Sequence, residues 1–169
     1  MRSPNHLEIK RRCKESVAPL MAKHRLGTAR QISIDDAGWV NPCIFVDDAF
    51  VFRFNARDPN LPKYQREKIA FELLRDTKVP VPRKVILDDS KTVSPFDVLI
   101  TERLPGRNLE SNWSNLSTPE RGDLATIAGR LFSLISSVQL PFFGELSEKG
   151  PLPQTKSWIE FLEAKLSFH

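Results

Sequence analysis

The sequence lacks any hydrophobic run long enough to cross a membrane, and its amino terminus lacks the apolar core of a secretory signal. Cysteine is scarce as well: the 169 residues contain only Cys13 and Cys43, and neither lies at metal-ligand spacing from a histidine. Two cysteines this far apart favour reduced thiols over a disulfide scaffold. We therefore expect a cytoplasmic protein with no membrane partner.

Glycine is sparse beside proline, with 7 residues against 13. The prolines fall where loops are expected, so they mark the loops of a globular chain and do not indicate a disordered or collagen-like segment. Hydrophobic residues make up 40% of the chain and charged residues 27%. This composition is typical of a globular protein that buries a core.

A large excess of charge of one sign is also missing, since the net charge is +4. Nucleic-acid binding usually needs Lys and Arg clustered on one face. The one short basic run, residues 10–14, lies between Glu8 and Glu15. It is better interpreted as a solvated helix face, and nucleic acid is an unlikely partner.

The hydrophobic pattern predicts an α+β order of elements. Apolar residues at steps of three and four predict a helix over 6–24, kinked or broken at Pro19. Short β-prone segments and turns then predict three antiparallel strands, a helix and two further strands. Their ranges are 31–34, 43–46, 50–54, 63–76, 84–87 and 97–101. Strands followed by helices favour α+β over a doubly wound sheet.

From residue 117 onward the pattern becomes helical. Ser117 with Glu120, and Ser157 with Glu160, have the spacing of capping boxes that open helices. The first helix is expected over 117–139, with one wide apolar face, and the second from 158 onward. Residues 141–153 between them are expected to form a loop.

Several motifs occur in a definite order. Arg53 stands alone among apolar residues on the third predicted strand, and Glu67 follows fourteen residues later on the helix. A Val-Pro-Val-Pro segment at 79–82 comes next, then Glu102 to Gly106, then residues 140–144 and 157–161. This succession resembles the aminoglycoside phosphotransferase and choline-kinase-like family over roughly residues 30–165. No single motif is decisive, but their order is specific.

The resemblance implies a protein-kinase-like N-terminal lobe, a five-stranded antiparallel sheet plus a helix, followed by the first helices of an α-helical C-terminal lobe. It divides the chain into an N-terminal helix (1–28), a nucleotide-binding lobe (29–104), and a hinge with an incomplete helical lobe (105–169). The implied ligands are ATP or GTP and a small hydroxylated acceptor. The implied reaction is transfer of a phosphoryl group to a hydroxyl.

Phosphoryl transfer needs the phosphates of the nucleotide held still and partly neutralised. A cation on the third strand can bridge them if a carboxylate fixes it, and Arg53 with Glu67 are the candidates by analogy with the strand lysine and helix glutamate of kinases. The alternative is a structural Arg–Glu pair that ties helix to sheet without a ligand.

The remaining candidates are weaker. Gly38 and Asn41 lie in the first hairpin turn, where kinases have their phosphate loop, although one glycine in a turn is often only a turn. The resemblance implies that the hinge contacts the edge of adenine and that apolar residues line the pocket beside it. Some of these apolar residues would belong to the core in any case. These candidates are Ile44, Val51, Thr101, Glu102, Arg103 and Leu104.

The catalytic motif of the family, H-x-D-x-x-x-x-N, does not occur, because none of the three histidines is followed by the required aspartate. We therefore assign no catalytic residue and no metal ligand. We expect Mg²⁺ only in a complete protein. We also expect this chain alone not to transfer phosphate at a useful rate. Self-association through unpartnered helix faces is also expected. The competing hypotheses are a non-catalytic nucleotide-binding or pseudokinase module and an unrelated α+β interaction domain.

Overall fold

The computed structural model describes residues 4–35, 41–140, 143–147, 150–151 and 155–166. The chain forms two compact units. The first comprises Met1–Lys68 and Pro82–Arg103, and the second comprises Ile69–Val81 and Leu104–His169. The amino-terminal helix thus shares one unit with the sheet, and the chain enters the second unit at Ile69 and again at Leu104.

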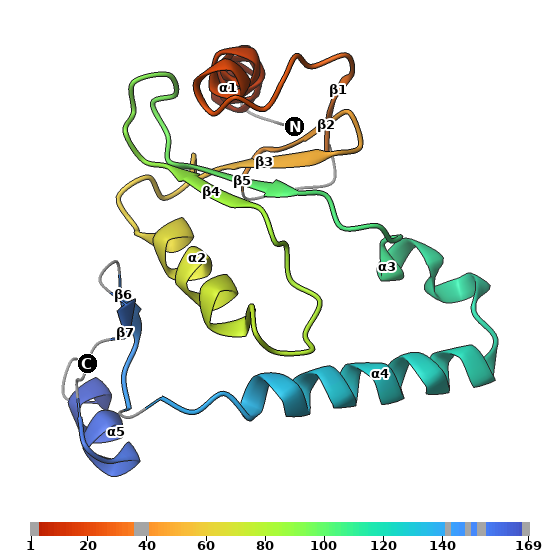
Figure 1. The fold of residues 1–169 in the computed structure, drawn as a ribbon, viewed down its shortest axis with the longest axis vertical. Coiled ribbons are helices and arrows are strands. Elements are labelled where there is room, and N and C mark those ends of the chain that lie inside the picture. The colour runs from red at the N-terminus through yellow and green to blue at the C-terminus, as the bar shows by residue number, and fades with distance from the viewer. Residues whose placement is uncertain (1–3, 36–40, 141–142, 148–149, 152–154, 167–169) are drawn as a thin grey trace. The chain divides into compact units, whose positions relative to one another are not determined.

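A five-stranded antiparallel sheet forms the centre of the first unit, in the order β1-β2-β3-β5-β4 (Figure 1). The strands are β1 (Ile32–Ile34), β2 (Cys43–Val46), β3 (Phe50–Phe54), β4 (Val85–Asp88) and β5 (Val98–Glu102). The predicted sheet and α+β class are confirmed. The turn between β2 and β3 uses Asp47 and Asp48, both at φ 52°, and aspartate tolerates this left-handed region better than most residues.

Strand pairing decides which side chains share a face of the sheet. Ile44, Phe52 and Ile100 are paired across β2, β3 and β5, so they lie on one face. One residue earlier on β2, Cys43 is paired with Arg53, which therefore lies on the opposite face. We call these the core face and the Arg53 face.

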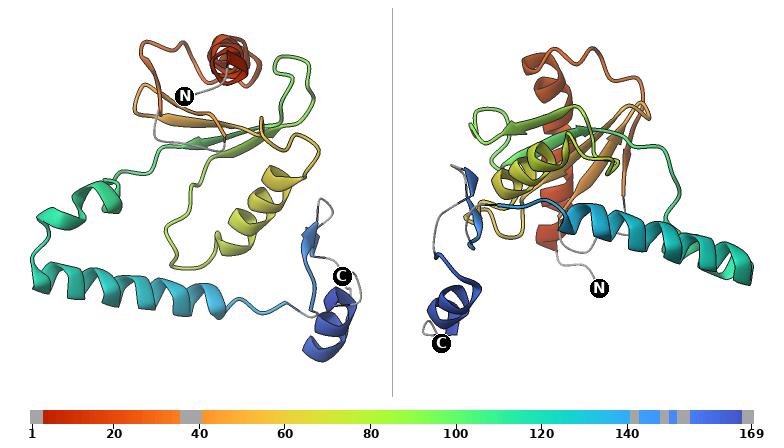
Figure 2. Two further views of the ribbon diagram at one scale, coloured as in Figure 1. Left: turned by 180° about the vertical axis from the view of Figure 1, so that it is seen from behind. Right: turned by 60° about the horizontal axis from the view of Figure 1, so that its bottom comes forward.

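Helix α1 (Pro4–Lys23) packs on the core face of the sheet (Figure 1, Figure 2). Cys13, Val17 and Leu20 are fully buried in one cluster with the apolar side chains of β2, β3 and β5. The helix runs without interruption through Pro19, so the predicted break does not occur. Buried residues on both sides of the proline hold it in place, and the helix ends just before Arg25, which has φ 54°.

Helix α2 (Lys63–Leu74) begins in the first unit, and its residues 63–68 lie on the Arg53 face. The buried side chain of α2 is Tyr64, which is 1% exposed. Sequence periodicity points instead to Ile69, Ala70, Leu73 and Leu74, and each of these is only half-buried. The first turn of α2 is thus the part that anchors it.

The second unit is mainly helical. Its elements are α3 (Leu109–Asn112), the 3-10 helix η1 (Trp113–Asn115), α4 (Thr118–Ser136), β6 (Leu146–Ser147), β7 (Gly150–Pro151) and α5 (Trp158–Leu166). The Glu120 carboxylate accepts a hydrogen bond from the Ser117 amide at 2.7 Å, as the predicted capping box requires, and it also accepts one from the Ser117 hydroxyl. The amide of Glu160 likewise donates to Ser157 Oγ at 3.2 Å. The short hairpin β6–β7 lies in the segment expected to be a loop.

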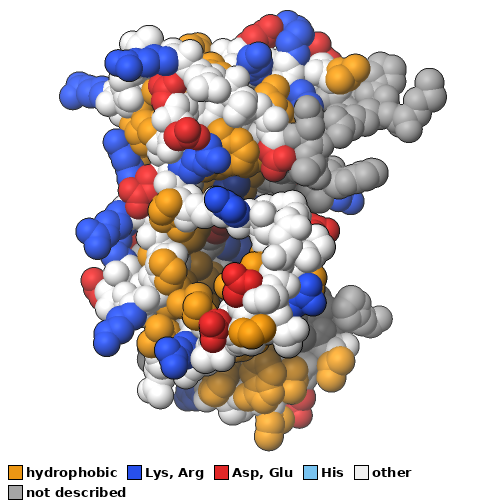
Figure 3. Space-filling model, turned by 90° about the vertical axis from the view of Figure 1, so that its right-hand side faces the viewer, with side chains coloured by type: hydrophobic (Ala, Val, Ile, Leu, Met, Phe, Trp, Pro, Cys, Tyr) orange, Lys and Arg blue, Asp and Glu red, His pale blue; other side chains and the backbone are white. Residues whose placement is uncertain are grey.

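The apolar faces of α4 and α5 remain open to solvent. Ile127 is 50% exposed and Phe132 73% on α4, and Ile159 is 67% exposed on α5. Hydrophobic side chains also reach the surface in the view of Figure 3. Self-association through these faces stays a prediction. Among the described helices, none combines the length and the hydrophobicity needed to traverse a bilayer.

Candidate functional site

The most distinctive group on the Arg53 face is an ion pair between strand and helix. Arg53 Nη2 lies 2.7 Å from Glu67 Oε1, and both side chains are slightly less than one-third exposed. The predicted pair is therefore present in the structure. A guanidinium has five N–H donors, so the bond to Glu67 leaves donors for a second anion.

Tyr64 provides a second contact for the same guanidinium. The Arg53 Cζ lies 5.6 Å from the centre of the Tyr64 ring, within range of a cation–π interaction. Burial raises the pKa of the Tyr64 phenol well above its ordinary value, although Arg53 opposes this shift. The ring therefore stays neutral and presents its π face to the arginine.

The neighbours of Arg53 form an apolar surface. On β3 and β5, Arg53 is paired with Leu99, and two residues away Val51 is paired with Thr101. On β2, Phe45 is paired with the same Val51. All five side chains thus point from the same face. Two of the predicted site residues, Val51 and Thr101, lie on the Arg53 face.

Cys43 lies beside Arg53 on this face. Burial raises the pKa of the Cys43 thiol, Asp35 raises it further, and Arg53 and Arg103 act in the opposite direction. The thiol is protonated at neutral pH, so it acts as a packing group and is a poor nucleophile.

Arg103 reaches back over the edge of the Arg53 face. Its guanidinium lies 4.6 Å from the centre of the Phe45 ring and is paired with the Asp48 carboxylate. The Arg103 guanidinium covers part of the Phe45 ring, which explains why Phe45 is only half-exposed. Arg103 thus brings a second cation to the same face as Arg53.

The backbone of the predicted hinge is partly used by the sheet. The Glu102 amide donates to the Lys84 carbonyl at 3.1 Å, and the Arg103 amide donates to the Ala49 carbonyl at 2.8 Å. The Glu102 carboxylate accepts from the Arg83 amide at 2.6 Å. These two amides are therefore already used by hydrogen bonds within the first unit.

Three of the predicted residues that the structure describes, Ile44, Asn41 and Glu102, do not join this face; Glu102 is paired with Phe50, on the core side of the sheet. Ile44 is fully buried on the core face with α1, so it cannot line the same surface as Arg53. The Asn41 side-chain oxygen accepts from the Ala56 and Arg57 amides, at 3.1 Å each, and thus supports the turn after β3. Gly38 lies outside the described residues.

Within the described ranges, no group of three or more His, Cys, Asp or Glu side chains could hold a metal ion.

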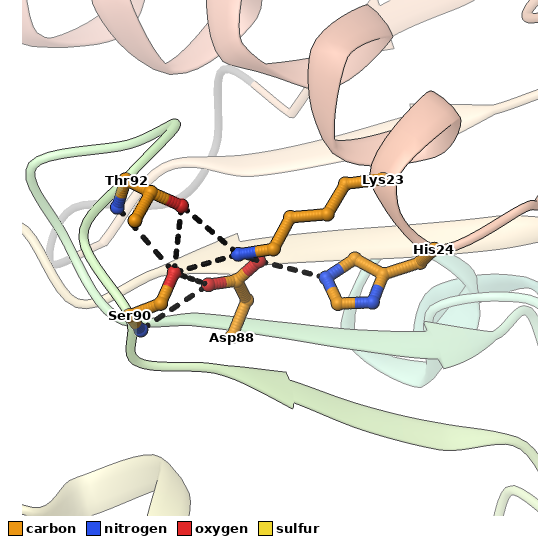
Figure 4. A network of polar contacts seen from close by, with 5 residues as sticks. All are labelled: Lys23, His24, Asp88, Ser90 and Thr92. Carbon is orange, nitrogen blue, oxygen red and sulfur yellow. Dashed lines mark hydrogen bonds and ion pairs between the residues drawn. The ribbon is translucent and has the colours of Figure 1, made fainter.

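A separate polar network joins α1 to the β4–β5 loop on the core side (Figure 4). Asp88 Oδ2 lies 2.8 Å from Lys23 Nζ and 2.7 Å from His24 Nε2, while Asp88 Oδ1 accepts from Ser90 Oγ at 2.7 Å. The Asp88 side chain is 4% exposed, so these bonds replace its water. Burial alone would raise the pKa of Asp88, but the bonds from Lys23, Ser90 and His24 together lower it well below its ordinary value.

The network makes a prediction about acid stability. A carboxyl whose pKa is lowered by folding stabilises the fold above its unfolded pKa of about 3.9 and loses that contribution as the pH falls further. Asp88→Asn should therefore cost about 1–3 kcal/mol of unfolding free energy at neutral pH. The gap from wild type should narrow as the pH falls from about 4 to about 2, as measured by urea unfolding.

The matched control is Asp89→Asn, an exposed aspartate next in the chain. It should leave both the stability and its pH profile unchanged within about 0.5 kcal/mol. A constant gap between Asp88→Asn and wild type over the whole pH range would contradict the assignment.

A five-stranded antiparallel sheet with a strand cation paired to a helix carboxylate has the arrangement of a protein-kinase-like N-terminal lobe. The model of the "Phosphotransferase enzyme family" matches residues 31–165, which is most of the chain. The protein therefore belongs to the phosphotransferase enzyme family. No curated protein matches the sequence.

Two solved structures share this fold. One is the complex of APH(2")-IIia with GDP and kanamycin, at TM-score 0.50 and 17% identity, matching 74% of this chain and 45% of that one. The other is wild-type aminoglycoside 2'-phosphotransferase-IIIa with GDP, at TM-score 0.53 and 16% identity, matching 73% of this chain and 44% of that one. The chain thus spans less than half the length of either, and the likeness shows a shared fold.

Sequence reasoning missed two residues of the Arg53 face, Phe45 and Tyr64. Tyr64 carried a signal, because it precedes Glu67 by three residues and so shares its side of the helix. Phe45 could be recognised only from the pairing of β2 with β3, because a shift of one residue exchanges the two faces of a strand.

Proposed function

We propose that this chain is the nucleotide-binding part of an enzyme that transfers the γ-phosphoryl group of ATP or GTP to a hydroxyl of a small molecule. The observation that carries the proposal is the Arg53–Glu67 pair, held at 2.7 Å on the sheet face of a phosphotransferase-family lobe. Both structural neighbours were solved with GDP, which supports a purine nucleotide as the ligand.

The predicted residues around Arg53 have distinct roles in this proposal. Arg53 would contact the α- and β-phosphates and neutralise part of their charge, and Glu67 would keep its guanidinium from swinging away. Val51 and Thr101 would lie against the base.

The proposal is tested by calorimetric titration with ATP and with GTP. Arg53→Ala should weaken the binding of the preferred triphosphate about 10- to 100-fold, since a charge-assisted hydrogen bond is worth about 1.5–3 kcal/mol. Arg12→Ala is the matched control, because Arg12 is exposed on α1 over the core face of the sheet. Unchanged triphosphate affinity in Arg53→Ala would leave the pair with only a structural role.

A further inference from the structure

Arg53 is held by two side chains of one helix, and only one of them is a carboxylate. Tyr64 and Glu67 are three residues apart on α2, so they project from the same side of the helix. Both contact the Arg53 guanidinium, Glu67 at 2.7 Å from Nη2 and Tyr64 with its ring centre 5.6 Å from Cζ. The strand cation is therefore fixed at two points.

The two contacts differ in kind. The Glu67 carboxylate meets the guanidinium through a charged contact, with Oε1 2.7 Å from Nη2. The Tyr64 ring lies against the guanidinium and favours particular orientations of its plane. The ring thus adds a second, independent constraint on the orientation of the cation.

Tyr64 is suited to this role because it is itself immobile. Its side chain is 1% exposed, and it is the one buried residue of α2. Arg53 in contrast remains 29% exposed, so its remaining N–H groups can meet a ligand. A fixed ring beneath a half-exposed cation holds the cation in place without consuming its hydrogen-bond donors.

We propose that Tyr64 is a positioning residue for nucleotide binding, which orients the Arg53 guanidinium toward the phosphates. This inference rests on the function proposed above. Tyr64 touches no phosphate itself and acts only through Arg53. It also accounts for arginine at a position where kinases use lysine, since a planar cation can lie against the ring.

The test compares Tyr64→Leu with Tyr64→Phe, which retains the ring. Affinity is measured by calorimetry for the triphosphate that wild type prefers and by ligand-observed NMR for the corresponding nucleoside, which lacks phosphates. Tyr64→Leu should weaken triphosphate binding about 3- to 30-fold, the effect of losing a largely desolvated cation–π contact, and leave nucleoside binding unchanged. Tyr64→Phe should bind both like wild type.

A double-mutant cycle tests whether Tyr64 acts through Arg53. In an Arg53→Ala background, Tyr64→Leu should cause no further loss of triphosphate affinity. If Tyr64→Leu does not fold, as judged by circular dichroism, Tyr64→Met replaces it, since methionine fills much of the same space without a ring.

The outcomes separate the two proposals. A wild-type protein that binds neither ATP nor GTP overturns the proposed function, and this inference with it. A wild type that binds triphosphate, together with a Tyr64→Leu variant that binds it equally well, overturns this inference alone. Equal losses for triphosphate and nucleoside also overturn it, because they indicate general damage to the fold.

Discussion

Replacing Leu20 of α1 with aspartate should unfold the sheet-containing unit. Leu20 is fully buried in the cluster that joins α1 to β2, β3 and β5. Loss of a buried leucine costs about 2–5 kcal/mol, and an unpaired buried carboxylate adds several more. Domains have only about 5–15 kcal/mol of stability in total. We expect thermal unfolding followed by circular dichroism to show no cooperative transition, or one far below that of wild type.

Leu7→Asp is the matched control for this variant. Leu7 lies on the same helix but is 62% exposed, so the same substitution there should change the stability by no more than about 0.5 kcal/mol. Equal unfolding temperatures for the two variants would show that α1 does not pack on the sheet. The result also bears on the family, because α1 precedes the matched residues 31–165 and yet supplies one side of the core.

Exchanging the charges of Arg53 and Glu67 should separate their structural role from their proposed role in binding. Arg53→Glu places a carboxylate beside Glu67 and opposite the phosphates. We expect triphosphate affinity to fall about 100-fold or more, because a favourable charged contact is replaced by repulsion. The unfolding temperature should also fall, since the strand and helix carboxylates now repel each other.

The double variant Arg53→Glu/Glu67→Arg restores an ion pair of reversed direction. Its unfolding temperature should return toward that of wild type, while triphosphate binding should stay weak because the cation now comes from α2 and not from β3. Calorimetry and thermal unfolding of wild type, the single variants Arg53→Glu and Glu67→Arg, and the double variant measure the two effects separately. Recovery of affinity in the double variant would contradict a specific role for a cation on β3.

Predictions from local pattern were accurate where a single element or a short spacing carried the information. The five strands were found within about one residue of their bounds, and the Arg53–Glu67 contact, predicted by analogy with the strand lysine and helix glutamate of kinases, is present. Ser117 with Glu120 likewise predicted the start of α4. These signals depend on the period of the hydrophobic residues and on hydrogen bonds within one turn.

Predictions that depended on a face or a distant partner were less accurate. Ile44 and Phe45 are adjacent and both apolar, so composition does not distinguish the buried position from the one on the Arg53 face. Asn41 was assigned to a phosphate loop but caps the backbone of residues 56 and 57. Pro19 was expected to break a helix that the core holds intact.

The sequence alone determined the order of helices and strands and the α+β class, because these follow from periodicity and spacing along the chain, while the pairing of Arg53 with Glu67 was predicted by analogy with kinases. Only the tertiary structure decided that α1 covers one face of the sheet, that Phe45 and not Ile44 shares a face with Arg53, and that the Tyr64 ring lies against the guanidinium. The physical reason is that side chains alternate along a strand, so the face of each residue depends on which neighbouring strand and which helix it meets.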